Sequence, residues 1–213
     1  NSTERFYYDL EGNRTDVITS QGSTSYDYDD LNRVVEERQA NRVVLNYTYD
    51  LNGNKIQLIM SRYGVNHQTD YTYDVLNRLK TVTDARGITT YGYDAVGNRT
   101  SVSYPNGTST TYAYDALNRL TGMNHYNALG SLTQSFDYTL HSTGRRTQID
   151  ELDGRSTVYG YDNLYRLTEE SITDTINGNY LSSYQYDKVG NRTTSTVDGV
   201  STTYVYDDND RIT

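Results

Sequence analysis

The sequence Tyr93-Asp94-Ala95-Val96-Gly97-Asn98-Arg99 belongs to a motif that recurs along the whole chain. A close copy, Tyr114-Asp115-Ala116-Leu117-Asn118-Arg119, follows 21 residues later. In each copy an aromatic residue stands two positions before the Tyr-Asp pair, and a turn that ends in a basic residue follows it. Ten copies occur, at intervals of 20 to 25 residues. A period of this size predicts one supersecondary unit stacked on itself, rather than a globular enzyme with a single cleft.

Four positions define the motif, and we predict that their residues are structural. The first ring is Phe6, Tyr26, Tyr47, Tyr71, Tyr91, Tyr112, Phe136, Tyr159, Tyr184 or Tyr204. The second ring is Tyr8, Tyr28, Tyr49, Tyr73, Tyr93, Tyr114, Tyr138, Tyr161, Tyr186 or Tyr206. The aspartate is Asp9, Asp29, Asp50, Asp74, Asp94, Asp115, Asp162, Asp187 or Asp207, with Thr139 in the seventh copy. The basic residue is Arg14, Arg33, Lys55, Arg78, Arg99, Arg119, Arg145 or Arg146, Arg166, Arg192 or Arg211.

Comparing the ten copies indicates what each position does. The first ring accepts Phe, so it needs a flat ring without a hydroxyl, whereas the second is always Tyr, so its hydroxyl is expected to have a buried partner. Residues two apart in a strand share a face, which predicts two ladders of stacked rings. Asp, or Thr, can accept a backbone N–H in a turn. Arg suits stacking on a tyrosine while pairing with an aspartate of its own or the next copy.

The segments between motifs read as β-hairpins. Residues 99–104 alternate polar and apolar side chains, a turn signal follows at Pro105-Asn106-Gly107, and residues 108–114 form a second run rich in Thr and Tyr. Asn-Gly between two such runs is a strong hairpin signal. No segment shows the apolar spacing of a helix. The sequence therefore predicts an all-β fold of tandem hairpins that form a continuous antiparallel strip.

A finer period joins the hairpins in pairs. Odd copies carry Gly before the basic residue, as in Asp9-Leu10-Glu11-Gly12-Asn13-Arg14, and even copies use a turn predicted to be one residue shorter, as in Asp29-Asp30-Leu31-Asn32-Arg33. The true unit is then two hairpins, of roughly 41–48 residues. The lengthened seventh copy, residues 138–146, predicts a bulge. We interpret residues 1–213 as one array, cut from a longer one.

Composition excludes several partners. A net charge of −9 and a pI near 4.7 argue against binding to nucleic acid. No apolar run approaches the ~18 residues of a spanning helix, so no membrane insertion is expected. The chain has no cysteine and therefore no disulfide. Its 24 tyrosines and mean hydropathy of −0.83 indicate an ordered protein whose interior is polar.

The repeated motif resembles the YD repeats of the RHS family, whose pattern is Tyr-x-Tyr-Asp-x-x-Gly-x-Arg. The resemblance covers the whole chain, and the even copies and the seventh copy depart from it. It implies hairpins laid side by side in a strip that spirals into a hollow shell, secreted or at the cell surface. In bacterial members the shell encloses a toxin, and in teneurins it supports adhesion. The sequence lacks the Asp-Pro-x-Gly-type segment that ends many bacterial cores, and its one proline is Pro105. Release of a cargo therefore does not carry over to this chain.

Candidate chemical sites are weak, and we predict no catalytic, cofactor-binding or metal-binding residue. Asp50-Leu51-Asn52-Gly53-Asn54 faintly resembles a calcium loop, but its glycine is misplaced and no bidentate Glu follows. His67, His125 and His141 lie far apart in sequence, which disfavours a zinc site. The pairs Glu36-Glu37 and Glu169-Glu170 could suggest a glycosidase, but they occupy equivalent strand positions. No Gly-x-Ser-x-Gly motif and no phosphate loop occur.

Two functions remain open from the sequence. The first is a non-enzymatic structural array of an RHS-type protein that encloses, displays or spaces another domain, with neighbouring repeats, self-association or an enclosed toxin polypeptide as partners. The alternative is an adhesion module that binds glycans or a protein partner and can assemble into extracellular filaments. Glycans would stack on the tyrosines outside the motif, which are Tyr7, Tyr63, Tyr104, Tyr126, Tyr165 and Tyr180.

Overall fold

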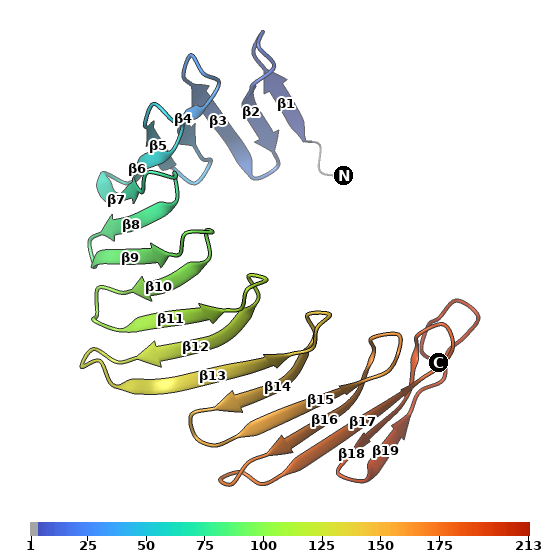
Figure 1. Ribbon diagram of the computed structural model, residues 1–213. Coiled ribbons are helices and arrows are strands. Elements are labelled where there is room, and N and C mark those ends of the chain that lie inside the picture. The colour runs from blue at the N-terminus through green and yellow to red at the C-terminus, as the bar shows by residue number, and fades with distance from the viewer. Residues whose placement is uncertain (1–3) are drawn as a thin grey trace. The chain divides into compact units, whose positions relative to one another are not determined.

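The structure of the protein, a computed structural model, describes residues 4–213 and consists of strands joined by turns (Figure 1). These residues form 19 strands and no helix, which confirms the predicted all-β class. Accordingly, no helix that could cross a lipid bilayer is found among them. The strands are β1 (Arg5–Tyr8), β2 (Arg14–Thr19), β3 (Gly22–Tyr28), β4 (Val34–Arg38), β5 (Val43–Tyr49), β6 (Lys55–Arg62), β7 (Val65–Tyr73), β8 (Leu79–Asp84), β9 (Gly87–Tyr93), β10 (Arg99–Ser103), β11 (Ser109–Tyr114), β12 (Leu120–Tyr126), β13 (Leu132–Leu140), β14 (Arg146–Glu151), β15 (Ser156–Tyr161), β16 (Leu167–Thr173), β17 (Tyr180–Tyr186), β18 (Arg192–Val197) and β19 (Val200–Thr203).

The chain divides into two compact units, residues 1–92 with 102–106 and residues 93–101 with 107–213. In the first unit, each strand from β1 to β9 pairs antiparallel with the next one along the chain. Strands β11 to β19 of the second unit do the same. Both sheets are open, so the predicted strip of tandem antiparallel hairpins is confirmed. A single array over all 213 residues stays a prediction.

Two kinds of connection alternate within each unit. The Tyr-Asp turns join one hairpin to the next along one edge of the sheet, and the hairpin tips lie along the other edge (Figure 1). Short hairpins keep second-ring positions 20 or 21 residues apart, as from Tyr8 to Tyr28. The hairpins β6–β7, β12–β13 and β16–β17 have longer arms or tips and widen this spacing. The irregular interval seen in the sequence therefore arises at the tips.

A shift of register precedes eight of the ten Tyr-Asp turns. It falls between Tyr7 and Tyr8 in the first copy and between Thr48 and Tyr49 in the third. Such a bulge adds one residue to one strand and strengthens the local twist. In the seventh copy the shift falls between Thr139 and Leu140, so Leu140 occupies the position predicted for Tyr138.

Little of the sheet is fully buried. Val102, at 2% exposed, is the only buried apolar side chain of the described residues, and Thr110, Thr157 and Ser182 are buried polar ones. Strands contact only their neighbours along the chain within each unit, so no second layer covers either face. The core is therefore a half-buried surface on which polar and aromatic side chains lie across adjacent strands.

Candidate functional site: the row of Tyr-Asp turns

All ten Tyr-Asp turns have one backbone geometry. The aspartate N–H donates to the carbonyl four residues later, from Asp9 to Asn13 (2.9 Å) in an odd copy and from Asp29 to Arg33 (3.0 Å) in an even copy. The residue before that acceptor has a positive φ, 87° at Gly12 and 57° at Asn32. The prediction of a shorter turn in even copies is therefore wrong. The turn is constant, and the position of the basic residue changes instead. Even copies place Asn32, Asn77, Asn118, Tyr165 or Asp210 at the left-handed position and Arg directly after it.

The aspartate carboxylate closes each turn from inside. In the third copy Asp50 Oδ1 accepts hydrogen bonds from the backbone N–H groups of Asn52 (2.9 Å) and Asn54 (2.8 Å). Its Oδ2 accepts a hydrogen bond from Asn54 Nδ2 (2.9 Å). In the second copy Asp29 Oδ2 accepts Arg33 Nε at 2.8 Å. These bonds favour the charged form, so the Arg33 side chain lowers the pKa of Asp29, and the Asn54 side chain lowers that of Asp50. Both Asp50 oxygens are thus used within the turn that resembled a calcium loop.

The second-ring hydroxyl reaches the preceding copy. Tyr49 Oη donates to the Val34 carbonyl at 2.8 Å, and Tyr28 Oη donates to the Arg14 carbonyl at the same distance. The accepting residue is always the fifth after the aspartate, that is, the first residue of the strand that leaves the turn. The expected hydroxyl partner is therefore a backbone carbonyl one copy earlier, and Tyr73, Tyr114, Tyr161, Tyr186 and Tyr206 make the same bond.

Even copies bind the following odd copy through arginine. Arg33 pairs with Asp29 of its own turn, and its Nη1 donates to the Asp50 carbonyl of the next at 3.2 Å. Its guanidinium carbon also lies 4.6 Å from the centre of the Tyr49 ring. Arg166 repeats this arrangement, with a 2.8 Å bond to the Asp187 carbonyl. One side chain therefore joins two turns and covers a ring.

Odd copies bind the following even copy through asparagine. Asn13 Nδ2 donates to Asn32 Oδ1 at 2.8 Å, and Asn54 Nδ2 donates to Asn77 Oδ1 at 2.9 Å. The basic residue lies one position later, where it covers a first ring instead, as Arg14 does over Tyr26 at 5.1 Å. These asparagines recur in copy after copy but were missing from the predicted motif residues. Their signal was the constant Asn before the odd basic residue. The same bridge joins Asn98 to Asn118 and Asn191 to Asp210.

The predicted ladders of tyrosine stacked on tyrosine are wrong. Within each unit the described residues show no ring contact between two tyrosines, and the ring pair found is His125 with Phe136, at 6.3 Å. Cations lie over the rings instead. The attraction between a guanidinium or ammonium group and the negative face of the ring offsets the cost of partly burying the charge. Cations lie over Tyr26, Tyr47, Tyr49, Tyr112, Tyr138, Tyr161, Tyr184, Tyr186 and Tyr204.

The seventh copy is shifted by two residues from its predicted alignment. Tyr138 takes the first-ring place, where Arg146 lies over it at 4.2 Å. His141 replaces the aspartate, and its Nδ1 accepts the Thr143 N–H at 3.2 Å. Arg145, the residue before Arg146, lies 4.0 Å from the Tyr165 ring centre instead of pairing with an aspartate of its own turn. The sequence predicts Phe136 and Tyr138 as the two rings because they have the spacing of the aromatic pair in the other copies.

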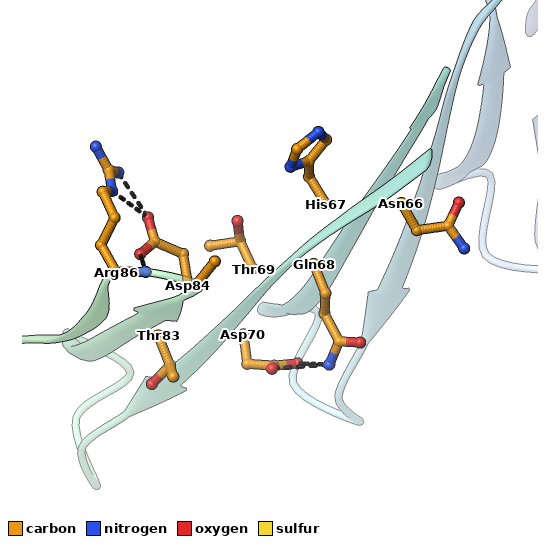
Figure 2. Close-up of a pocket in the computed structure, with 9 residues that line it drawn as sticks. Asn66, His67, Gln68, Thr69, Asp70, Thr83, Asp84 and Arg86 are labelled. Atoms are coloured by element: carbon orange, nitrogen blue, oxygen red, sulfur yellow. Dashed lines mark hydrogen bonds and ion pairs between the residues drawn. The ribbon is translucent and has the colours of Figure 1, made fainter. Parts of the chain in front are cut away.

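The hollows of the surface are open and polar. One of about 560 Å³ lies beside β7 and the β8–β9 tip, where Gln68 Nε2 donates to Asp70 Oδ2 (2.8 Å) and Arg86 Nη2 pairs with Asp84 (2.6 Å). Figure 2 shows these two pairs, with His67 directed away from Asp70. Among the described residues, no three His, Cys, Asp or Glu side chains converge as metal ligands would. The charged groups here are engaged with one another.

Comparisons with known proteins agree with the repeat geometry. The sequence model named RHS Repeat matches residues 73–109 and 93–125. Among curated proteins, no sequence relative of this chain was found. Solved structures share the fold: a TcdB2-TccC3 crystal structure (TM-score 0.59, 17% identity, 98% of this chain and 14% of that one) and TcdB2-TccC3 without its hypervariable C-terminal region (0.51, 14%, 100% and 18%). A Photorhabdus luminescens Tc holotoxin pore also matches (0.50, 15%, 99% and 17%).

The chain spans about a sixth of the length of these solved structures. The residues matched by the family model contain the fourth, fifth and sixth Tyr-Asp turns, and the same turn geometry is found in all ten copies. Residues 73–125 of this chain therefore carry RHS repeats, also called YD repeats, and the other Tyr-Asp turns share their geometry.

Proposed function

We propose that this array is a non-catalytic structural wall of a secreted or cell-surface RHS-type protein, and that it encloses, displays or spaces another domain. The observation that carries the proposal is where the motif side chains are used. Tyr49 and Arg33 bond to the backbone of adjacent copies, and Asp29 and Asp50 are bound within their turns. Motif groups that join neighbours in this way serve cohesion and are not available to a substrate.

The solved structures support this role by analogy. One of them is a Tc holotoxin pore, and another is TcdB2-TccC3 without its hypervariable C-terminal region. A wall around a variable polypeptide needs self-cohesion that does not depend on the sequence enclosed. The contacts described here provide it, because they lie between copies of the array. An enclosed toxin polypeptide is therefore the partner that we propose, and a surface element is the second.

Limited proteolysis of the native protein that contains this array tests the proposal. We expect the segments that flank the array to resist trypsin in the wild type and to be cut at least ~10-fold faster in an Arg33→Gln/Tyr49→Phe variant. An Arg86→Gln variant is the control, since Arg86 is 87% exposed on a hairpin tip. Equal cleavage of the flanking segments in all three proteins would contradict a role in enclosure. Protease treatment of intact cells tests the surface location.

The adhesion alternative has one specific observation in its favour. Tyr104, 44% exposed, lines a hollow of about 480 Å³ together with the Asp84–Arg86 pair. A flat ring beside hydrogen-bonding groups suits a sugar ring. Of the other tyrosines predicted for glycans, Tyr63 and Tyr165 are also exposed. Binding to a glycan array that is lost in Tyr104→Ala, and kept in the second-ring variant Tyr49→Phe, would favour adhesion over a purely structural role.

A further inference from the structure

A row of aliphatic side chains stands exposed on the Tyr-Asp turns. It uses the first or second residue after the aspartate, and we call it the turn ridge. Leu10, Leu51 and Val75 are about fully exposed, at 102%, 103% and 99%. The other members are 61% to 74% exposed. The turn ridge comprises Leu10, Leu31, Leu51, Val75 and Leu76 in the first unit, and Val96, Leu117, Leu164 and Val189 in the second.

The fold itself does not require these side chains. Turn apices favour Asp, Asn, Gly, Pro and Ser, because those residues bond locally or accept the backbone angles. Each turn here is already closed by its aspartate and by the left-handed residue, such as Asp50 and Gly53 in the third copy. Single exposed aliphatic residues need no explanation. An aliphatic residue at the first or second position after the aspartate in eight of ten turns does need an explanation, because the surrounding sequence has diverged between copies.

We propose that the turn ridge is an interface for a second copy of this chain. Successive Tyr-Asp turns in a unit are two strands apart, which is about 9.5 Å along the sheet edge. A second copy has the same spacing, so its aliphatic side chains fit between those of the first over several turns. Further repeats of the same kind share this period, whereas a partner of another kind would have to match it by coincidence. A two-fold arrangement with the two ridges face to face uses one surface on both copies.

The area available is sufficient for such a contact. Burying one exposed Leu or Val side chain removes about 100 Å² from water, so the five ridge residues of the first unit, counted on both copies, give roughly 1,000 Å². A specific interface needs about that much. The turn ridge is therefore large enough for a weak dimer without any contribution from the sheet faces.

Charge does not oppose the contact at the centre of the first unit. The chain carries a net charge of −9, which makes two copies repel at a distance. The apex residues of the third and fourth turns, Leu51, Asn52, Val75 and Leu76, are all uncharged. The carboxylate of Asp74 nearby is paired with Arg78 at 2.7 Å. A dimer that forms through these turns is therefore expected to tighten as salt screens the remaining repulsion.

Sedimentation equilibrium of the full chain tests the interface. We expect the 24.3 kDa chain to dimerise with a Kd of about 10–100 µM, which corresponds to roughly 5.5–7 kcal/mol. Leu31→Asn/Val75→Asn should weaken the dimer about 100-fold, because two aliphatic side chains of each copy leave the interface. The matched control is Leu129→Asn/Ile176→Asn, which changes two hairpin-tip residues that are 90% and 71% exposed.

The urea midpoint of each variant is measured in parallel, so that unfolding is not mistaken for loss of contact. An unchanged midpoint with a raised Kd for the ridge variant alone supports the turn ridge. A chain that stays at 24.3 kDa up to about 200 µM would overturn the proposal, as would equal weakening by the tip variant. Neither result would bear on the structural wall, which rests on contacts within the chain.

Discussion

The hydroxyl of Tyr49 donates to the carbonyl of Val34 at 2.8 Å, which fastens the third copy of the repeat to the second. Val34 is the first residue of β4, and Tyr49 is the last residue of β5. The bond therefore lies beside the turn edge, next to the Arg33 guanidinium that covers the same ring. This arrangement explains why the second ring is tyrosine in nine of the ten copies, including the first, where the first ring is Phe6.

Tyr49→Phe should lower the free energy of unfolding by about 0.5–1.5 kcal/mol, because the Val34 carbonyl loses its donor. Tyr47→Phe is the matched control two residues earlier in the same strand. The Tyr47 ring is covered by Lys55 at 4.2 Å, but its hydroxyl has no hydrogen bond in the described structure. We expect a change below about 0.3 kcal/mol there. Urea unfolding of both variants checks the difference, and equal losses would contradict a role for the hydroxyl.

Arg33→Lys should cost about 1–2 kcal/mol although it keeps the charge. Lysine cannot reproduce the fork that pairs with Asp29 and the Asp50 carbonyl while lying flat on Tyr49. Arg86→Lys is the control, because exposed ion pairs at a tip contribute little. The measurement is the midpoint of thermal unfolding. A shift no larger for Arg33→Lys than for Arg86→Lys would show that the bridge between turns is dispensable.

The array should lose stability in acid. Hydrogen bonds lower the folded-state pKa of Asp29, Asp50 and Asp115, so the ionised turns stabilise the fold above the unfolded pKa of about 4. That stability is lost as pH falls through the lowered folded values, between about pH 5 and pH 2. Urea midpoints across this range measure it. Asp50→Asn should flatten the dependence, and an unchanged dependence in that variant would contradict the role of its carboxylate.

The array should also lose stability in strong base. Burial raises the pKa of Tyr49 and Tyr73, whose hydroxyls must be protonated to donate. Their contribution is complete below the unfolded pKa of about 10 and is lost as pH rises through the raised folded values. Circular dichroism and tyrosinate absorbance followed together above pH 9 check this. Ionisation of most tyrosines with no loss of β-structure would contradict it.

Close approach of neighbouring tips predicts unequal effects of two glycine substitutions. A Cβ added at Gly22, where φ is 129°, would lie 2.5 Å from the Ala40 Cβ of the next tip. At Gly12, where φ is 87°, nothing lies within 4 Å. Gly12→Ala should therefore cost about 1–2 kcal/mol through its backbone, and Gly22→Ala about 1–3 kcal/mol more through the clash. Unfolding free energies in urea provide the comparison.

The sequence was sufficient to predict the hairpins and the RHS-type repeat. Turn signals such as Asn106-Gly107 and the strict Tyr-Asp spacing are local, so they predict strands and turns without knowledge of packing. The hydroxyl partner of the second ring could also be inferred, because ten copies showed that Phe is accepted at one ring and never at the other. The identity of the backbone carbonyl that accepts this bond could not be inferred, since it depends on the register between strands.

The wrong predictions of the turn length, the seventh copy and the tyrosine ladders have one physical source. The sequence marks the end of the turn by its basic residue, whereas the backbone ends the turn according to the position of the left-handed residue, Gly12 or Asn32. An alignment of the copies by their arginines therefore does not reveal that arginine bridges and asparagine bridges alternate between the copies. The seventh copy was misaligned for a similar reason, because Leu140 and His141 hold the turn without the expected ring and carboxylate. Tyrosine ladders are predicted because the spacing of the rings does not reveal the cations that lie over them. These cations come from the same copy, as Lys55 does over Tyr47, or from the preceding copy, as Arg33 does over Tyr49.

A double-mutant cycle on Arg33 and Tyr49 tests the cohesion between copies most directly. Arg33→Gln, Tyr49→Leu and the double variant are compared with the wild type by urea unfolding. If side chains that reach across copies hold the array together, the pair should couple by at least about 1 kcal/mol, while Arg86→Gln with Tyr49→Leu should be additive within about 0.5 kcal/mol. A coupling of Arg33 with Tyr49 no larger than that of the control pair would contradict the account.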